Sequence, residues 1–252
     1  MNFNFIKKYY HILNLALHYK INPGYCPICE QQTYFVQFSE WLRDYYKCNN
    51  CDSIPRQRAL VNALNLFIPE WKNITIHESS PCGQASEHIK RYCHQYTQSY
   101  FFPDIPLGAY KNGNRCENLE RMTFPDNSFD LFITQDVMEH VNNPEKAFKE
   151  ISRVLKPDGI YLFTVPIYQN IDHSYPRISL SDGGQVFLIK DPVFHGNPID
   201  KDGSLVTYDY GRDLSDQIFR WSGMFTTIFV CRDKNLGIDG EFLEVCISKK
   251  DK

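Results

Sequence analysis

The feature that most constrains the fold of this chain is a strand, a helix and a second strand in direct succession. Residues 129–135 form an apolar run of strand length, and residues 160–165 are rich in β-branched and aromatic side chains. Between them, residues 144–155 have helical spacing, with Asn143 placed to cap the first turn and Pro144 at the first helical position. This order predicts two parallel strands covered by one helix.

The same alternation begins near residue 73 and continues toward the C-terminus. The expected elements are strands over residues 74–78, 95–100, 113–118, 225–231 and 241–248, and helices over residues 59–71 and 84–92. A Gly-rich turn joins the last two strands. The pattern predicts an α/β fold with a doubly wound sheet, in which ligands bind at the carboxyl ends of the strands.

By composition the chain divides into three parts. Residues 1–22 predict an amphipathic helix ended by a Pro-Gly pair, residues 23–58 hold paired cysteines, and residues 59–252 hold the α/β domain. The N-terminal helix either packs on the domain behind it or serves as a membrane-surface or dimerisation helix. Residues 166–220 are rich in Gly, Pro, Asp and Tyr. They are too long for an ordinary connector, so we expect a functional insertion on the substrate side.

Four cysteines follow the spacing C-x2-C-x18-C-x2-C, at positions Cys26, Cys29, Cys48 and Cys51. Two such pairs present four thiolates, which is a donor set for tetrahedral zinc. Redox-active or free thiols are the alternative. Because the chain supplies all four ligands, we expect a structural Zn²⁺ in a small zinc-ribbon-like module. The ion would supply folding energy that so small a module cannot obtain from its own core.

Two arginines directly follow the second cysteine pair. Arg56 and Arg58 either bind a phosphate or a substrate carboxylate, or anchor the cysteine module to the main domain. The residues alone leave both interpretations open.

The charge balance bears on the partners of the chain. Lys and Arg number 27 against 30 Asp and Glu, a formal net charge of −3, whereas a large nucleic-acid surface needs an excess of basic residues. Nine cysteines at irregular spacing make a poor disulfide framework and are typical of a reducing compartment. The N-terminus does not have the pattern of a signal peptide, and no apolar run is long enough to span a bilayer. These features predict a cytoplasmic location.

Residues 120–130 read Glu-Arg-Met-Thr-Phe-Pro-Asp-Asn-Ser-Phe-Asp and continue as LFITQDVMEHV and NPEKAFKEISRVLKPDGIYLFTVP. This stretch resembles the class I S-adenosylmethionine-dependent methyltransferases of the ubiquinone and small-molecule type. The resemblance rests on the "fPDnSFD" entry to the fourth strand, the "EHv" after it and the "E-RvLKPgG" turn before the fifth. It implies a Rossmann-like sheet with a C-terminal antiparallel strand, and S-adenosyl-L-methionine as the cofactor.

The resemblance also implies where the cofactor binds. The family ends its first strand in an acidic residue followed by a Gly-rich loop, and the corresponding residues here are Glu78, Ser79, Ser80 and Gly83. Serines stand where the first two glycines are expected. Glycines let the backbone approach the cofactor closely, whereas serine hydroxyls offer hydrogen bonds to its carboxylate.

Further cofactor contacts follow from the next strands. Ser99 lies near the position of the family's ribose-binding acid, and Asp104 is a nearby substitute. Asn118 stands where the family has its adenine-contacting acid and offers a carbonyl oxygen to the adenine amino group, while Leu119 would cover the ring. Gln135 would face the methyl-transfer cleft.

The candidate catalytic residues are one carboxylate and three histidines. Asp136 and His140 follow the fourth strand, and His173 and His195 lie in the insertion. A histidine near the cleft can accept the proton of a hydroxyl acceptor. Burial of Asp136 could raise its pKa and make it a base, or Asp136 could instead hold the cofactor's amino group.

We expect an O-methyltransferase acting on a polar small molecule or on a sugar or glycan precursor. The polar and aromatic insertion suits carbohydrate stacking and hydroxyl recognition. One alternative is a ribosomal RNA or other RNA methyltransferase whose zinc module contacts RNA, although the charge balance makes nucleic acid an improbable partner. Another is a non-catalytic binding scaffold on a methyltransferase fold. A homo-oligomer stays open.

Overall fold

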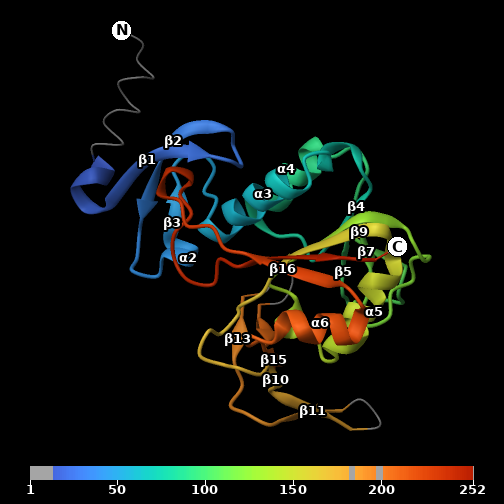
Figure 1. Cartoon of the computed structure of the whole chain (residues 1–252). Helices are drawn as coiled ribbons and strands as arrows, with labels where there is room; N and C mark the ends of the chain where they lie inside the picture. The colour runs from blue at the N-terminus through green and yellow to red at the C-terminus, as the bar shows by residue number, and fades with distance from the viewer. Residues whose placement is uncertain (1–13, 182–184, 197–200, 252) are drawn as a thin grey trace.

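A computed structural model describes residues 14–181, 185–196 and 201–251 of the chain. A central sheet carries helices on both faces, with a small antiparallel module at one end and a set of short two-stranded sheets beneath it (Figure 1). Within the described residues the central sheet has eight strands, in the order β16-β17-β9-β8-β4-β5-β7-β6.

The strands of the central sheet lie close to where the alternation predicts them. They are β16 (Phe225–Phe229), β17 (Val245–Lys249), β9 (Leu155–Thr164), β8 (Phe129–Gln135), β4 (Ile76–Ser79), β5 (Tyr96–Tyr100), β7 (Asn114–Cys116) and β6 (Tyr110–Lys111). The strands β7, β5, β4, β8 and β9 pair in parallel, and β17 pairs antiparallel with both β9 and β16. The predicted doubly wound, Rossmann-like sheet with a C-terminal antiparallel strand is confirmed.

Each face of the sheet carries its own apolar layer. Helices α3 (Pro55–Phe67) and α4 (Gly83–Tyr92) cover one face, and α5 (Pro144–Val154) and α6 (Leu214–Ser222) cover the other (Figure 1). Strand β8 shows the reason, because alternate side chains of a strand point to opposite faces. Leu131 and Ile133 join the layer of α3 and α4, and Phe132 joins that of α5 and α6.

Local signals in the sequence account for the ends of the helices. Helix α5 begins as expected, with Pro144 in its first turn and the Asn143 side chain accepting a hydrogen bond from the Lys146 amide at 3.0 Å. Helix α6 begins inside the insertion predicted over residues 166–220 and extends beyond it, and no helix was expected there from the sequence. Leu214 and Ile218 of α6 are fully buried against the sheet, and this tertiary packing stabilises a short helix of weak sequence signal.

The cysteine module is a sheet of three antiparallel strands within the described part of the chain. The strands are β1 (Lys20–Cys26), β2 (Gln31–Gln37) and β3 (Tyr46–Cys48), and the short helix α2 (Leu42–Tyr45) precedes β3.

The predicted helix over residues 1–22 lies partly outside the described residues. Residues 14–18 are helical, but its predicted end is wrong because β1 starts at Lys20. Pro23 is tolerated in β1 because that strand is at the edge of its sheet.

The connection between β16 and β17 is not the short turn expected from the sequence. It runs from the main sheet to the cysteine module and back, and its 3-10 turn η3 (Lys234–Leu236) packs against β1 (Figure 1). A Cβ on Gly24 would lie 2.1 Å from the Asn235 carbonyl oxygen. The close approach therefore requires glycine at position 24.

The insertion after β9 forms three short antiparallel strand pairs within the described residues. The pairs are β10 (Tyr175–Pro176) with β15 (Tyr208–Asp209), β11 (Ile178–Leu180) with β12 (Val186–Leu188), and β13 (Phe194–His195) with β14 (Ser204–Leu205).

Outside the insertion, two further 3-10 turns are η1 (Trp71–Asn73) and η2 (Met138–His140). Among the helices in the described ranges, none has the length and apolar character that crossing a bilayer requires.

Candidate functional site

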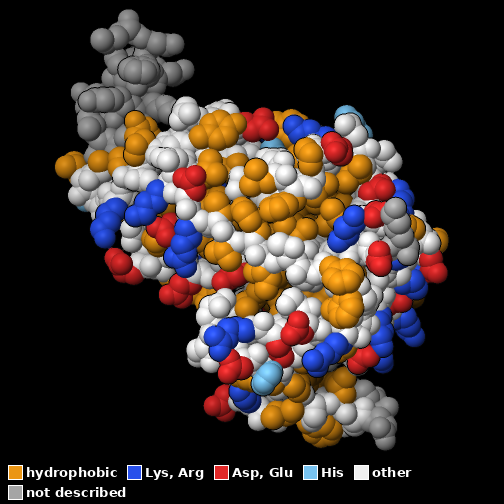
Figure 2. Space-filling view, viewed as in Figure 1, with side chains coloured by type: hydrophobic (Ala, Val, Ile, Leu, Met, Phe, Trp, Pro, Cys, Tyr) orange, Lys and Arg blue, Asp and Glu red, His pale blue; other side chains and the backbone are white. Residues whose placement is uncertain are grey.

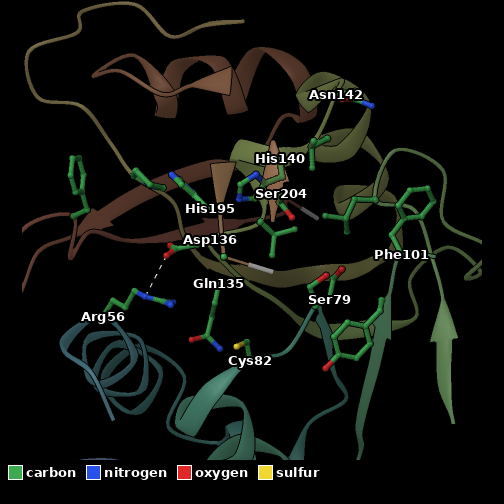
Figure 3. Close-up of a pocket in the computed structure, with 18 of the residues that line it drawn as sticks. Arg56, Ser79, Cys82, Phe101, Gln135, Asp136, His140, Asn142, His195 and Ser204 are labelled. Atoms are coloured by element: carbon green, nitrogen blue, oxygen red, sulfur yellow. Dashed lines mark ion pairs between the residues drawn. The ribbon is translucent and has the colours of Figure 1, made fainter. Parts of the chain in front are cut away.

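A cavity of about 800 Å³ opens where the parallel strands end, and three separate parts of the chain enclose it. The strand ends and the turns after them form its floor, the cysteine module and α3 form one wall, and the insertion forms another. Its lining includes Trp41, Arg43, Asp44, Arg56, Ser79, Ser80, Cys82, Tyr100, Phe101, Glu117, Asn118, Leu119, Gln135, Asp136, His140, Tyr168, His195, Ser204 and Phe242. Figure 3 shows His140, His195 and Ser204 together on one side, with Ser79, Cys82 and Gln135 across from them. The volume lies within the range of small-ligand pockets.

Five of the residues expected to bind the cofactor lie on this cavity. They are Ser79, Ser80, Asn118, Leu119 and Gln135. Ser80 has a φ of 55°, in the left-handed region that favours glycine. The chain therefore keeps the backbone turn of a Gly-rich loop with a serine in its place.

Four other expected cofactor residues do not line the cavity. Gly83 starts α4, and a Cβ there would lie 1.9 Å from the Gln57 amide nitrogen, so its glycine serves helix packing. Ser99 is buried, with its hydroxyl 2.9 Å from His77 Nε2. Asp104 is exposed on the loop after β5.

Glu78 is the fourth expected cofactor residue that does not line the cavity. Its carboxylate is buried within a network of hydrogen bonds. Ser86 and Gln135 donate to Oε1 at 2.7 and 2.8 Å, and Tyr96 donates to Oε2 at 2.7 Å. Burial raises the pKa of Glu78 even though these donors lower it. In this arrangement Glu78 orients Gln135, which itself reaches the cavity.

Asp136 lies on the cavity but is not suited to act as a base. Burial alone would raise its pKa, but the guanidinium groups of Arg56 and Arg43 lower it to about 2. Arg43 Nη2 lies 2.5 Å and Arg56 Nε 3.4 Å from Asp136 Oδ2, and Thr164 donates to Oδ1 at 2.9 Å. Of the two alternatives for Asp136, the raised pKa is contradicted, because Arg43 and Arg56 converge on it in a way that the sequence could not show.

The three candidate histidines separate in space. His140 and His195 both line the cavity, with ring centroids 5.1 Å apart. His173 does not line it; its side chain is 88 % exposed and lies 3.4 Å from Asp213. The structure therefore brings together two of the three.

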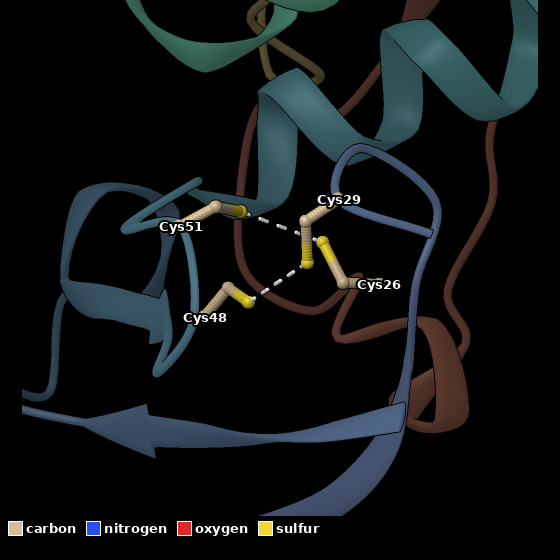
Figure 4. A group of neighbouring side chains, drawn as sticks. All are labelled: Cys26, Cys29, Cys48 and Cys51. Carbon is tan, nitrogen blue, oxygen red and sulfur yellow. Dashed lines mark hydrogen bonds between the residues drawn. The ribbon is translucent and has the colours of Figure 1, made fainter. Parts of the chain in front are cut away.

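The four cysteines of the two pairs converge at one point, as Figure 4 shows. The sulfurs of Cys26 and Cys51 are 3.8 Å apart, and those of Cys29 and Cys48 are 3.9 Å apart. Zn–S bonds of about 2.3 Å in a tetrahedron place sulfurs about 3.8 Å from one another. Sulfurs joined in a disulfide are only about 2 Å apart. The donor set and its spacing fit a tetrahedral metal ion.

The two arginines after the module have different roles. Arg58 is fully buried and donates to the backbone carbonyls of Tyr46, Ser53 and Gly237. It thereby joins the cysteine module to the β16–β17 connection, which is the anchoring interpretation. Arg56 instead lines the cavity and forms an ion pair with Asp136.

Several cavity residues were not anticipated from the sequence. Trp41 and Arg43 come from the cysteine module, Tyr168 from the insertion and Phe242 from the β16–β17 connection. No local motif marks them, because they reach the cavity only through the packing of these segments. Glu139 lies off the lining but directly precedes His140, and this adjacency was the one signal that could have been noticed in the sequence.

Part of the chain is similar to known methyltransferases. A family model described as a methyltransferase domain matches residues 82–163. The human mitochondrial arginine-hydroxylase NDUFAF5 is 31 % identical over 90 residues, which are 32 % of this chain and 26 % of that protein. The ubiquinone/menaquinone biosynthesis C-methyltransferase UbiE of Cronobacter sakazakii is 35 % identical over 65 residues, 25 % of this chain and 26 % of that protein. This chain thus spans about a quarter of the length of these relatives.

Among solved structures, a Mesorhizobium loti S-adenosylmethionine-dependent methyltransferase is similar over 76 % of this chain and 98 % of its own, with a TM-score of 0.47 and 17 % identity.

Proposed function

We propose that this chain, a member of the class I S-adenosylmethionine-dependent methyltransferase family, is an O-methyltransferase. Its acceptor would be an oxygen atom of a polar small molecule or of a sugar or glycan precursor. One observation carries the proposal. The cavity at the carboxyl ends of β4 and β8 is lined by expected cofactor residues, by two imidazoles that lie across from Ser79 and Gln135 (Figure 3), and by aromatic side chains.

The sheet side of the cavity suits the cofactor. Leu119 offers an apolar surface to an adenine ring, and the neighbouring Asn118 offers a side-chain amide. Ser79 and Ser80 lie at the turn after β4, where the left-handed backbone of Ser80 allows close approach. S-adenosyl-L-methionine, when bound, supplies a methyl group on a sulfonium centre.

The opposite side of the cavity suits the acceptor. Trp41, Tyr168 and Phe242 give it aromatic faces, which favour the stacking of a sugar or another ring. His140 and His195 line the same cavity and are the groups that we propose activate the acceptor hydroxyl. Asp136 holds Arg43 and Arg56 in the wall and has no proton-accepting role.

The cysteine module serves this site through its structure. We propose that Cys26, Cys29, Cys48 and Cys51 hold a structural Zn²⁺, since four thiolates leave no open coordination position. The module then positions Trp41 and Arg43 in the cavity wall.

An RNA acceptor would need a different surface. Lys and Arg side chains are interspersed with Asp and Glu on the face seen in Figure 2, and the charge balance is acidic overall. Arg58 is buried, so it cannot join Arg56 in a basic path to the cavity. A small, enclosed acceptor site is the better match.

Binding of S-adenosylhomocysteine, followed by titration calorimetry on the full chain, tests the cofactor half of the proposal. We expect saturable binding at one site, weakened roughly tenfold by Asn118→Ala, which corresponds to about 1.4 kcal/mol. Asp104→Asn is the matched control, since Asp104 is exposed and lies off the cavity lining. Absence of saturable binding by the folded wild-type chain would support the non-catalytic scaffold instead.

A further inference from the structure

The carboxylate of Glu139 is buried beside the cavity without a compensating donor. Its side chain is 3 % exposed, and no described residue donates a hydrogen bond to either of its oxygens. A buried carboxylate normally gains such partners, because losing hydration costs several kcal/mol. Two other buried carboxylates, Glu78 and Glu117, illustrate this. Three side chains donate to Glu78, and Arg115 and the Thr123 amide donate to Glu117.

Two imidazole nitrogens face the Glu139 carboxylate. His195 Nδ1 lies 3.5 Å and His140 Nε2 lies 3.9 Å from Glu139 Oε1. Both distances exceed those of charge-assisted hydrogen bonds, which are about 2.7–2.9 Å. One ligand atom of each residue nevertheless lies within 4.8 Å of the other two. The three groups therefore surround a point without bonding to one another.

The hydrogen bonds around His140 prepare it to be a ligand. Its Nδ1 lies 2.8 Å from the Leu205 carbonyl oxygen, an acceptor, so Nδ1 carries the proton. The lone pair is then on Nε2, the atom that faces Glu139. Metal-binding histidines are commonly held this way, with the second ring nitrogen donating to a backbone carbonyl.

Arg43 does not supply the missing partner. Its guanidinium donates to Asp136 Oδ2 at 2.5 Å and to the Phe242 carbonyl at 3.4 Å, so its hydrogen bonds go elsewhere. A cation among Glu139, His140 and His195 would compensate the carboxylate.

We propose that Glu139, His140 and His195 form a binding site for a divalent transition-metal ion, separate from the four-cysteine site. Ligand atoms about 2.1 Å from a tetrahedral ion lie about 3.4 Å from one another, so the observed distances need little adjustment. Two imidazoles and one carboxylate suit ions such as Fe²⁺, Co²⁺ or Zn²⁺.

The position of the ion gives it a role in the reaction, and this part rests on the proposed function. His140 and His195 line the cavity, whereas Glu139 does not, so the one free position of a tetrahedral ion faces the acceptor side. An acceptor hydroxyl bound there would lose its proton more readily, because a metal ion lowers the pKa of a coordinated oxygen. The oxygen would then attack the methyl carbon as the carbon–sulfur bond breaks, and the proton would leave to solvent.

Co²⁺ titration of the full chain, with one Zn²⁺ already bound per chain, tests the site without cofactor or acceptor. We expect one further Co²⁺ per chain, with weak visible absorption bands and no intense thiolate-to-metal band. Thiolates prefer to keep zinc, which binds more tightly than cobalt. No second ion, or an ion that gives the thiolate band, would overturn the proposal. S-adenosylhomocysteine binding, measured in parallel, shows separately whether the cofactor site is intact.

Matched variants locate the ion. Glu139→Gln and His195→Gln should weaken Co²⁺ binding at least tenfold, while thermal unfolding shows that each variant is folded. His173→Gln is the control, because that histidine belongs to the same insertion but lies off the cavity. Equal Co²⁺ affinity in the folded Glu139→Gln and His173→Gln chains would contradict the assignment.

Discussion

Replacing Asp136 by Asn is expected to lower the free energy of unfolding by about 3 kcal/mol or more, as seen when one partner of a buried ion pair is removed. Asp136 compensates Arg43, whose side chain is only 10 % exposed, and Arg56, which is 18 % exposed. Without the carboxylate, two cations stay in the cavity wall with reduced compensation. Urea unfolding followed by circular dichroism measures the loss.

The choice of asparagine isolates the charge. Asp136 has a φ of 52°, which asparagine tolerates, whereas Asp136→Ala adds roughly 1–2 kcal/mol of backbone strain. Asp130→Asn is the control, because Asp130 pairs with Lys156 at 2.8 Å in a site about one third exposed. A pair of that kind contributes at most about 1 kcal/mol. Equal losses in the two asparagine variants would show that Asp136 is no more than a surface ion pair.

Chelation of the zinc proposed for the four-cysteine site is expected to unfold residues 20–51 and to abolish S-adenosylhomocysteine binding. Structural zinc contributes about 10–16 kcal/mol in small zinc-binding peptides, which matches the whole stability of many domains. The sulfurs lie 3.8 Å (Cys26 and Cys51) and 3.9 Å (Cys29 and Cys48) apart. Without an ion bound by all four, nothing at this point links the end of β1 to the end of β3. Trp41 and Arg43 would then leave the cavity wall. Hydrogen exchange read segment by segment before and after chelation follows the loss, and added Zn²⁺ should reverse it.

Cysteine variants separate the metal site from general thiol chemistry. Cys29→Ser should lose zinc and expose the module to exchange. Cys231→Ser should keep one zinc per chain, because Cys231 lies in the β16–β17 connection outside the cluster. Full zinc content and an ordered module in Cys29→Ser would contradict the structural role of the ion.

Local patterns were enough for the core of the fold. Residues 129–135 read as a buried strand, and β8 has these bounds. The Asn143 cap and the Pro144 start of α5 likewise depend on residues within one turn. The paired cysteines also met as expected, because their spacing encodes two knuckles. In each case the physical cause acts between neighbours in the sequence.

The sequence by itself therefore determined the doubly wound sheet, the cysteine cluster and part of the cavity floor. Only the tertiary structure decided that Arg43 and Arg56 pair with Asp136 and lower its pKa, and that His195 comes to lie beside Glu139 and His140. It also decided that the β16–β17 connection reaches the cysteine module through Arg58. These contacts join residues far apart in the chain, and their charges and hydrogen bonds depend on distance in space, which local patterns do not encode.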